Sequence, residues 1–182
     1  GKITFVGSKA DALKQQAEST VLKDLAGKTL MPGFIDGHAH AQQFGTQAVG
    51  ANLLAPPDGA VNTVDDLVAT LKTFAVGPDV ALTGWIFGMG YDDALLGRHP
   101  TRADLDKVST TVPVMATHIS GHFAAVNTLG LQMIGYDAST PNPEGGVIRR
   151  EACGKAPSGV LEELAAMPYV VKFLAPTGQA GK

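Results

Sequence analysis

His38 and His40, separated by one residue, are the side chains of this sequence best suited to hold a metal ion. In an extended strand, residues i and i+2 point to the same face, so the two imidazoles and Asp36 would converge. Neutral imidazole nitrogens bind zinc well, and a divalent ion lowers the pKa of its bound water toward roughly 7. We therefore predict a metal site, with the nearest nitrogens about 3 to 4 Å apart. The spacing alone also fits two histidines that cap a strand through hydrogen bonds.

Two further histidines flank Ser120-Gly121, after an apolar run that predicts a strand over residues 113–119. Barrel enzymes place substrate-binding groups where strands end, so we predict that His122 contacts a substrate. His118 lies inside the predicted strand, and we expect it to point away from such a site. A purely structural role is the alternative for both histidines.

Two acidic pairs also follow apolar runs. Asp92 and Asp93 come after a predicted strand over residues 81–87, and we predict that Asp92 binds substrate. Capping or turn formation explains an Asp-Asp pair equally well. Glu162 and Glu163 lie near the start of a predicted helix, where the helix dipole alone favours a carboxylate.

The elements that would position these residues alternate along the chain. Strands are predicted near residues 33–38, 81–87 and 113–119, with helical spacing of apolar residues between them. Strand, helix, strand is the signature of parallel βαβ units with right-handed crossovers. A small hairpin or insertion is predicted near residues 140–157, followed by a helix over residues 158–174.

Composition narrows the possible partners. The 182 residues are 45% hydrophobic and 17% charged, with a formal net charge of −3, which is typical of a globular domain. The longest basic cluster is Arg149-Arg150, so we expect no nucleic-acid partner and favour a small-molecule substrate. No apolar run reaches a membrane span, so we expect no membrane partner and a cytoplasmic location. The single cysteine, Cys153, excludes an internal disulfide.

The metal-ligand pair lies within a longer motif. Pro32-Gly33-Phe34-Ile35-Asp36-Gly37-His38-Ala39-His40 resembles the metal-binding first strand of the amidohydrolase superfamily. Further segments follow one another as in its amidohydrolase-3 branch, which includes N-substituted formamide deformylases: Tyr91-Asp92-Asp93, Arg98-His99-Pro100-Thr101-Arg102, His118-Ile119-Ser120-Gly121-His122, Gly145-Gly146-Val147-Ile148-Arg149 and Gly159-Val160-Leu161-Glu162-Glu163. The resemblance spans nearly the whole chain.

The resemblance implies an α/β fold: part of a (β/α)₈ TIM-type barrel with part of a flanking composite β-sandwich domain. Residues 1–31 would belong to the small β domain, and residues 32–182 would form the first βα units. It also implies hydrolysis of amide-like C–N bonds at one or two divalent metals, zinc being expected, with Glu163 as a further ligand. The remaining ligands and the general base are expected beyond Lys182.

The stretch after Gly33 is about 150 residues, against roughly 250 for a complete eight-fold barrel. We therefore expect the remainder of the barrel, or another subunit, to cover exposed apolar surface. A non-catalytic ligand-binding or regulatory homologue of the same fold is the alternative to an enzyme.

Overall fold

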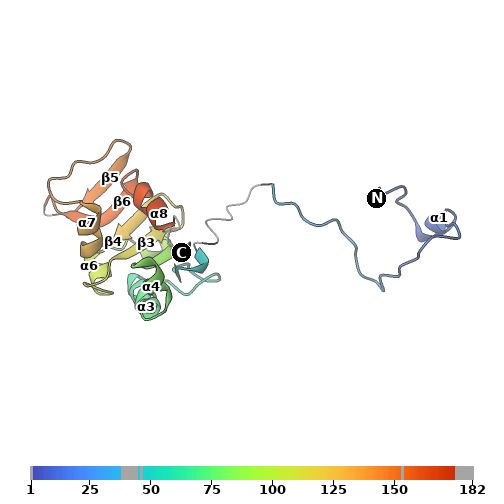
Figure 1. Cartoon of the computed structure of the whole chain (residues 1–182), viewed down its shortest axis with the longest axis horizontal. Coiled ribbons are helices and arrows are strands. Elements are labelled where there is room, and N and C mark those ends of the chain that lie inside the picture. The colour runs from blue at the N-terminus through green and yellow to red at the C-terminus, as the bar shows by residue number, and fades with distance from the viewer. Residues whose placement is uncertain (1, 38–44, 46, 153, 175–182) are drawn as a thin grey trace, which may run out of the picture. The chain divides into compact units, whose positions relative to one another are not determined.

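The computed structural model describes residues 2–37, 45, 47–152 and 154–174, in two compact units of residues 1–39 and 40–182 (Figure 1). In the first unit, the described residues form one short helix, α1 (Lys9–Leu13), which Ser8 caps by accepting from the backbone N–H of Asp11. The strand predicted from residue 33 is not formed in its described part, up to residue 37. Phe34 and Ile35 are 92% and 93% exposed, so no neighbouring strand pairs with this segment or buries its apolar face.

The second unit is built on one six-stranded sheet with the order β1-β2-β3-β4-β6-β5. β1, β2 and β3 pair in parallel, whereas β4, β6 and β5 continue the sheet in antiparallel fashion. The strands are β1 (Ala51–Asn52), β2 (Ile86–Tyr91), β3 (Val114–His118), β4 (Phe123–Val126), β5 (Gly146–Arg150) and β6 (Pro157–Glu163). The sheet confirms the mixed α/β class and the parallel pairing of the second and third predicted strands.

Two of the described helices begin at capping boxes. α3 (Val64–Ala75) starts at Thr63, whose side chain and that of Asp66 each accept from the other's backbone N–H. α6 (Arg102–Asp106) starts at Thr101 with Asp104 in the same role. The remaining helices are α4 (Asp79–Thr83), α5 (Asp93–Leu96), α7 (Thr128–Ile134) and α8 (Met167–Leu174).

The predicted strand over residues 81–87 begins later than expected. Residues 79–83 form α4, which ends at Gly84 in the left-handed conformation that glycine adopts readily, and β2 then runs from Ile86 to Tyr91. Its carboxyl end therefore lies four residues further along the chain than predicted. This shift brings Tyr91 and the acidic pair that follows it to the end of the sheet.

The helix predicted over residues 158–174 is wrong in its first half. Residues Pro157–Glu163 form β6, which lies between β4 and β5, and only Met167–Leu174 is helical. Gly159 has φ of +98°, and a Cβ there would lie 2.5 Å from the carbonyl oxygen of Val126. Strand pairing on both sides thus overrides a local pattern that also fits a helix.

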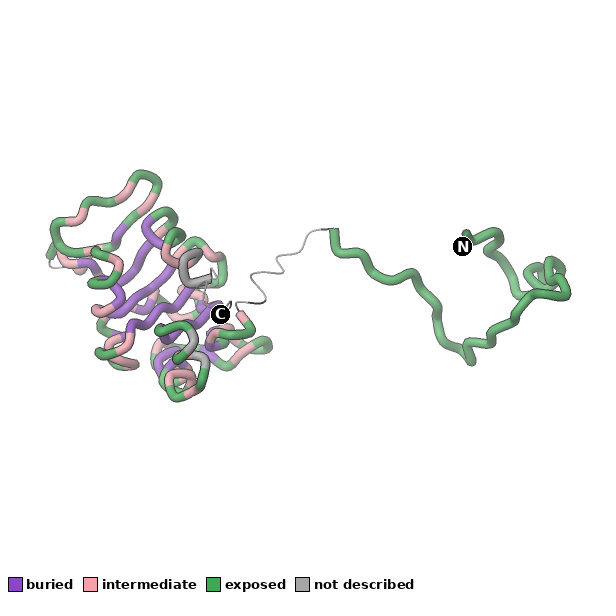
Figure 2. The backbone as a smooth tube through the Cα atoms, viewed as in Figure 1, coloured by how far each residue is buried: buried purple, intermediate pink, exposed green. Residues whose placement is uncertain are grey.

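The strands of the sheet are buried along most of their length (Figure 2). The core lies on both faces of the sheet, because alternate strand residues point to opposite sides. One hydrophobic cluster joins Leu67 and Leu71 of α3 to Ile86 and Val114. The other contains Phe87, Met115 and Leu161, with Tyr169 of α8 packed against it. Both faces of the central strands are covered by the core. A side chain that these strands hold rigidly and that also reaches solvent therefore lies where a strand ends.

Candidate functional site

Polar side chains gather at the end of the sheet where β2, β3 and β6 finish and β4 begins, called here the carboxyl end. Because β4 runs antiparallel to both β3 and β6, its first residue lies beside their last residues. Four of the residues found here are Asp93 after β2, His118 in β3, His122 before β4 and Glu163 in β6. In barrel enzymes the corresponding end carries the active site.

His122 and Glu163, predicted separately as substrate-binding and metal-ligating residues, lie in direct contact. The Nδ1 atom of His122 is 2.9 Å from Oε2 and 3.1 Å from Oε1 of Glu163. The backbone N–H of Glu163 also donates to the carbonyl oxygen of His122 at 2.8 Å. Since their side chains are 52% and 48% exposed, the pair can meet a ligand from solvent.

Glu163 has an unusual backbone conformation for a residue with a side chain. Its φ of +49° lies in the left-handed region, which costs a non-glycine residue roughly 1–2 kcal/mol. Such conformations cluster at functional sites. Glu163 ends a strand and opens no helix, so the helix-dipole explanation of this carboxylate is wrong.

A second group lies at the ends of β2 and β3. One ligand atom from each of Asp92, Asp93 and His118 can be chosen so that all three lie within 4.8 Å of one another. Asp92 also caps α5 by accepting from the backbone N–H of Ala94 at 2.9 Å, as the capping alternative predicted. These residues therefore combine a local structural role with a donor set that could hold a cation.

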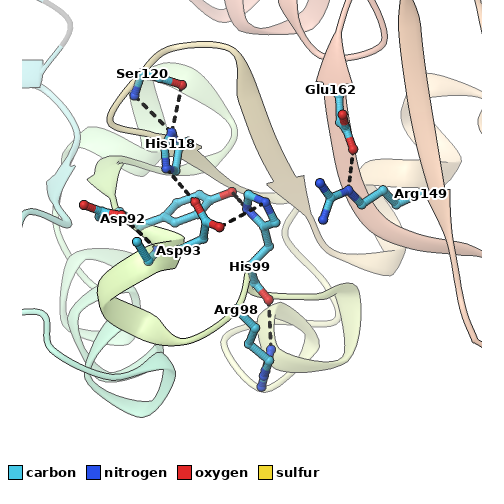
Figure 3. Close-up of polar contacts among 10 residues, drawn as sticks. Asp92, Asp93, Arg98, His99, His118, Ser120, Arg149 and Glu162 are labelled. Carbon is cyan, nitrogen blue, oxygen red and sulfur yellow. Dashed lines mark hydrogen bonds and ion pairs between the residues drawn. The ribbon is translucent and has the colours of Figure 1, made fainter.

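His118 points toward the acidic pair, contrary to the prediction that it points away from the strand ends. Its Nε2 atom is 3.0 Å from Oδ1 of Asp93 (Figure 3). It is the last residue of β3 and lies opposite Tyr91 in the register, after an irregularity of β2 at Gly90. Gly90 has φ of +103°, which glycine tolerates, and a bulge of this kind re-aims the residues that follow.

Sequence reasoning also missed His99, which lies in the loop before α6. Its Nε2 atom is 3.6 Å from Oδ2 of Asp93, and its Nδ1 atom is hydrogen-bonded to the hydroxyl of Tyr91 at 3.1 Å. Burial lowers the pKa of His99, although the Asp93 charge opposes this effect. Burial, together with the charge of Asp93, raises the pKa of Tyr91. Both rings are therefore neutral near pH 7. No strand-end pattern marks His99, although it lies in the segment Arg98-His99-Pro100-Thr101-Arg102 that follows the family resemblance.

Only some of the predicted site residues lie within the part of the chain that the structure describes. His38 and His40 lie outside the described residues, so the predicted distance between their imidazoles remains a prediction. Asp92, His122 and Glu163 all lie at the carboxyl end, in two separate contacts. The candidate site consists of the His122–Glu163 pair and the Asp92, Asp93 and His118 group beside it.

A family model matches most of the chain. The model of the Amidohydrolase family matches residues 22–180. The chain belongs to the amidohydrolase family. Among curated amidohydrolase relatives, the exoenzymes regulatory protein AepA of Pectobacterium carotovorum is 35% identical over 91% of this chain and 36% of its own length. N-substituted formamide deformylase of Arthrobacter pascens is 30% identical over 91% of this chain and 30% of its own.

Solved structures show the same likeness. An uncharacterized metal-dependent hydrolase from Pyrococcus furiosus superposes with a TM-score of 0.50 and 27% identity, over 79% of this chain and 25% of that one. The chain thus spans about a third of the curated relatives it matches and about a quarter of this structure. Within the described residues, no helix is both long and apolar enough to cross a membrane.

Proposed function

We propose that the amidohydrolase containing this chain hydrolyses an amide-like C–N bond of a small molecule, using a divalent metal. His38, His40 and Glu163 would hold the metal, with zinc as the ion and either one or two ions bound. The single observation that carries this proposal is the His122–Glu163 contact, which joins strand ends 41 residues apart in sequence. Family membership and the likeness to metal-dependent hydrolases support it.

The donor set fits such an ion. Imidazole nitrogens and a carboxylate are the ligands that zinc takes in hydrolytic sites. Glu163 is half-exposed at the carboxyl end, and its two oxygens can serve His122 and a cation together because a carboxylate has about four lone-pair positions. When bound, the metal supplies Lewis acidity at the carbonyl and activation of water.

The chain's own residues would orient the substrate. Glu163 faces Nδ1 of His122, which fixes the hydrogen of the neutral ring on that atom and leaves Nε2 as an acceptor. Nε2 can then accept a hydrogen bond from a substrate N–H or take up a proton from it. Asp92, half-buried after β2, would offer its carboxylate as a second contact.

The test compares the full-length amidohydrolase with this 182-residue chain. The full-length protein should hydrolyse an N-substituted formamide when zinc is added, and it should lose this activity to a chelator. His38→Ala and His40→Ala should each abolish it, while the 182-residue chain alone should show none, because a catalytic zinc site needs about three protein ligands. A full-length enzyme that is indifferent to both chelator and histidine replacement would refute the metal mechanism.

A non-catalytic, ligand-binding homologue is the second candidate, because AepA is named a regulatory protein. In that case the full-length protein would bind zinc and small amides without turnover. Calorimetry and an amine-release assay on the same preparation separate the two functions.

A further inference from the structure

The side chain of Arg149 reaches the carboxyl end of the sheet and has no role in the proposed reaction. Its backbone lies on β5, but its guanidinium extends across β6 to β4, where Cζ lies 6.0 Å from the centre of the Phe123 ring. The Nε atom donates a hydrogen bond to Oε1 of Glu162 on β6. Contacts with two other strands thus fix the direction of a side chain that otherwise has large rotamer freedom.

The bond to Glu162 leaves one edge of the guanidinium open. Within the residues that the structure describes, neither Nη1 nor Nη2 of Arg149 makes a hydrogen bond, and the side chain is 44% exposed. In Figure 3 these terminal nitrogens point away from Glu162, toward the side on which His99 lies. Two coplanar N–H donors on one edge match the two oxygens of a carboxylate.

The neighbouring Arg150 shows how an arginine with a structural role is bound in the same hairpin. Its Nη1 atom donates to the carbonyl oxygens of Asp137 and Lys155, and its Nη2 atom donates to that of Thr140. Both terminal nitrogens of Arg150 therefore hold the chain together. The terminal nitrogens of Arg149 make no such bonds, so they are available to a ligand.

The open edge lies close to the proposed substrate site. Glu162 and Phe123, which orient the guanidinium, are the sequence neighbours of Glu163 and His122. Adjacent strand residues face opposite sides of a sheet, so the guanidinium and the His122–Glu163 pair border the same strand ends from two sides. A small molecule that lies across these strand ends can contact both.

The charge of Arg149 also acts on its aromatic neighbours. The ring of Phe123 contacts both the guanidinium and His99, whose ring centre lies 5.1 Å from its own. Burial is the main cause of the lowered pKa of His99, and the positive charge of Arg149 lowers that pKa further. His99 is therefore neutral near pH 7, and among these three residues Arg149 carries the positive charge that would attract an anion.

We propose that Arg149 binds a carboxylate group of the substrate and makes the enzyme selective for anionic amides. This inference rests on the proposed hydrolysis of an amide-like C–N bond and names the substrate class. Nη1 and Nη2 hold the two carboxylate oxygens, while the amide lies at the His122–Glu163 pair. Because Glu162 already holds Nε, the donors are oriented before the ligand arrives, and little side-chain freedom is lost on binding.

The test compares acids with neutral amides of the same shape as substrates of the full-length enzyme with zinc. The short pair is formamidoacetate and formamidoacetamide, and the long pair is para-(formamidomethyl)benzoate and para-(formamidomethyl)benzamide. In at least one pair, kcat/KM should be higher for the acid by at least about tenfold, since hydrogen bonds to charged groups are the stronger ones. Arg149→Gln should abolish this preference by lowering kcat/KM for the acid far more than for the amide.

Two further variants serve as controls. Arg149→Lys keeps the charge but loses the planar pair of donors, so it should retain only part of the preference. Lys72→Gln removes an exposed positive charge from α3 and should leave the preference unaltered. Far-UV circular dichroism of all variants should match that of the parent enzyme.

Binding to an inactive enzyme separates this proposal from the proposed hydrolysis. In full-length enzyme carrying His38→Ala, calorimetry should show tighter binding of the acid than of the amide, and adding Arg149→Gln should remove the difference. If the parent enzyme hydrolyses no formamide but this difference persists, the hydrolase proposal fails and the carboxylate site stands. Equal values for acid and amide in both pairs, or a preference that survives Arg149→Gln, would overturn the proposal and leave Arg149 and Glu162 as an ordinary surface ion pair.

Discussion

The two ends of the sheet differ in how completely their polar groups are satisfied. At the carboxyl end, histidines and carboxylates meet in half-exposed contacts, and one buried nitrogen has no hydrogen bond. At the opposite end, where β4 finishes beside the start of β3, Asn127 is fully buried and its side chain makes four hydrogen bonds. The carboxyl end thus holds a buried nitrogen without a hydrogen bond, whereas the side chain of Asn127 at the opposite end has its oxygen and nitrogen fully hydrogen-bonded.

The hydrogen bonds of the Asn127 side chain join several backbone segments at that opposite end. Its side-chain oxygen accepts from the backbone N–H groups of Val114 and Gly130, and its amide donates to the carbonyl oxygens of Ser109 and Val112. The nearby α6 is tied to the same region through Asp106, which accepts from Thr128. We propose that stability and ligand binding are assigned to separate ends of the strands, as they are in barrel enzymes.

The largest expected effect is on activity and comes from the carboxyl end. Glu163→Gln in the full-length amidohydrolase should lower kcat/KM by roughly 100-fold or more, since even residues behind metal ligands are worth 10–100-fold. The free energy of unfolding should change little, because the side chain is half-exposed. Kinetics with added zinc and urea unfolding on one preparation check both statements. A large loss of stability would contradict the assignment of function to this end.

The next effect is on stability and comes from the opposite end. Asn127→Ala leaves two buried N–H groups and two carbonyl oxygens without their partner, and we expect the free energy of unfolding to fall by about 3 kcal/mol. Urea unfolding of the chain measures it. Asn62→Ala at an exposed position is the matched control and should change stability by less than about 0.5 kcal/mol. Equal effects of the two variants would remove the proposed difference between the ends.

Asp104→Asn should have a smaller, pH-dependent effect. Burial alone would raise the pKa of Asp104, but hydrogen bonds from Arg98 and Thr101 outweigh it and hold that pKa well below its usual value. The ionised carboxylate therefore stabilises the fold above the unfolded-state pKa of about 3.9, and this contribution is lost as pH falls toward the lower folded-state pKa. We expect a loss of about 2 kcal/mol in the free energy of unfolding near pH 7.

Acid unfolding provides the check for Asp104. The stability difference between the parent chain and Asp104→Asn should shrink progressively below about pH 4. A difference that stays constant between pH 7 and pH 3 would show that the carboxylate charge is not what the capping box uses.

The smallest expected effect is that of His122→Gln on stability. Its contact with Glu163 is half-exposed, and exposed polar pairs of this kind contribute about 0–1 kcal/mol, so the free energy of unfolding should change by less than about 0.5 kcal/mol. Activity of the full-length enzyme should nevertheless decrease, because Nε2 of His122 is lost. Paired kinetic and urea measurements decide the point, and unchanged kinetics would exclude His122 from substrate binding.

Local sequence determined those elements whose signals lie within a few residues. The N-cap at Ser8 and the capping boxes at Thr63 and Thr101 are each completed by a side chain three positions away, so their signals lie within the local sequence. The parallel pairing of β2 and β3 also followed from the alternation of strands and helices. The prediction of Glu163 as a ligand rested on the family resemblance, whereas His122 was predicted from its place after a strand.

Tertiary structure alone decided how the site residues are paired. The local pattern of residues 158–163 predicted a helix, but pairing of the segment 157–163 with β4 and β5 makes it a strand that carries Glu163 to His122. In the same way, the irregularity at Gly90 sets Tyr91 against His118 and brings Asp93 within 3.0 Å of its ring. These contacts depend on strand register, which is fixed by hydrogen bonds between segments far apart in the chain and leaves no periodic signal in either segment alone.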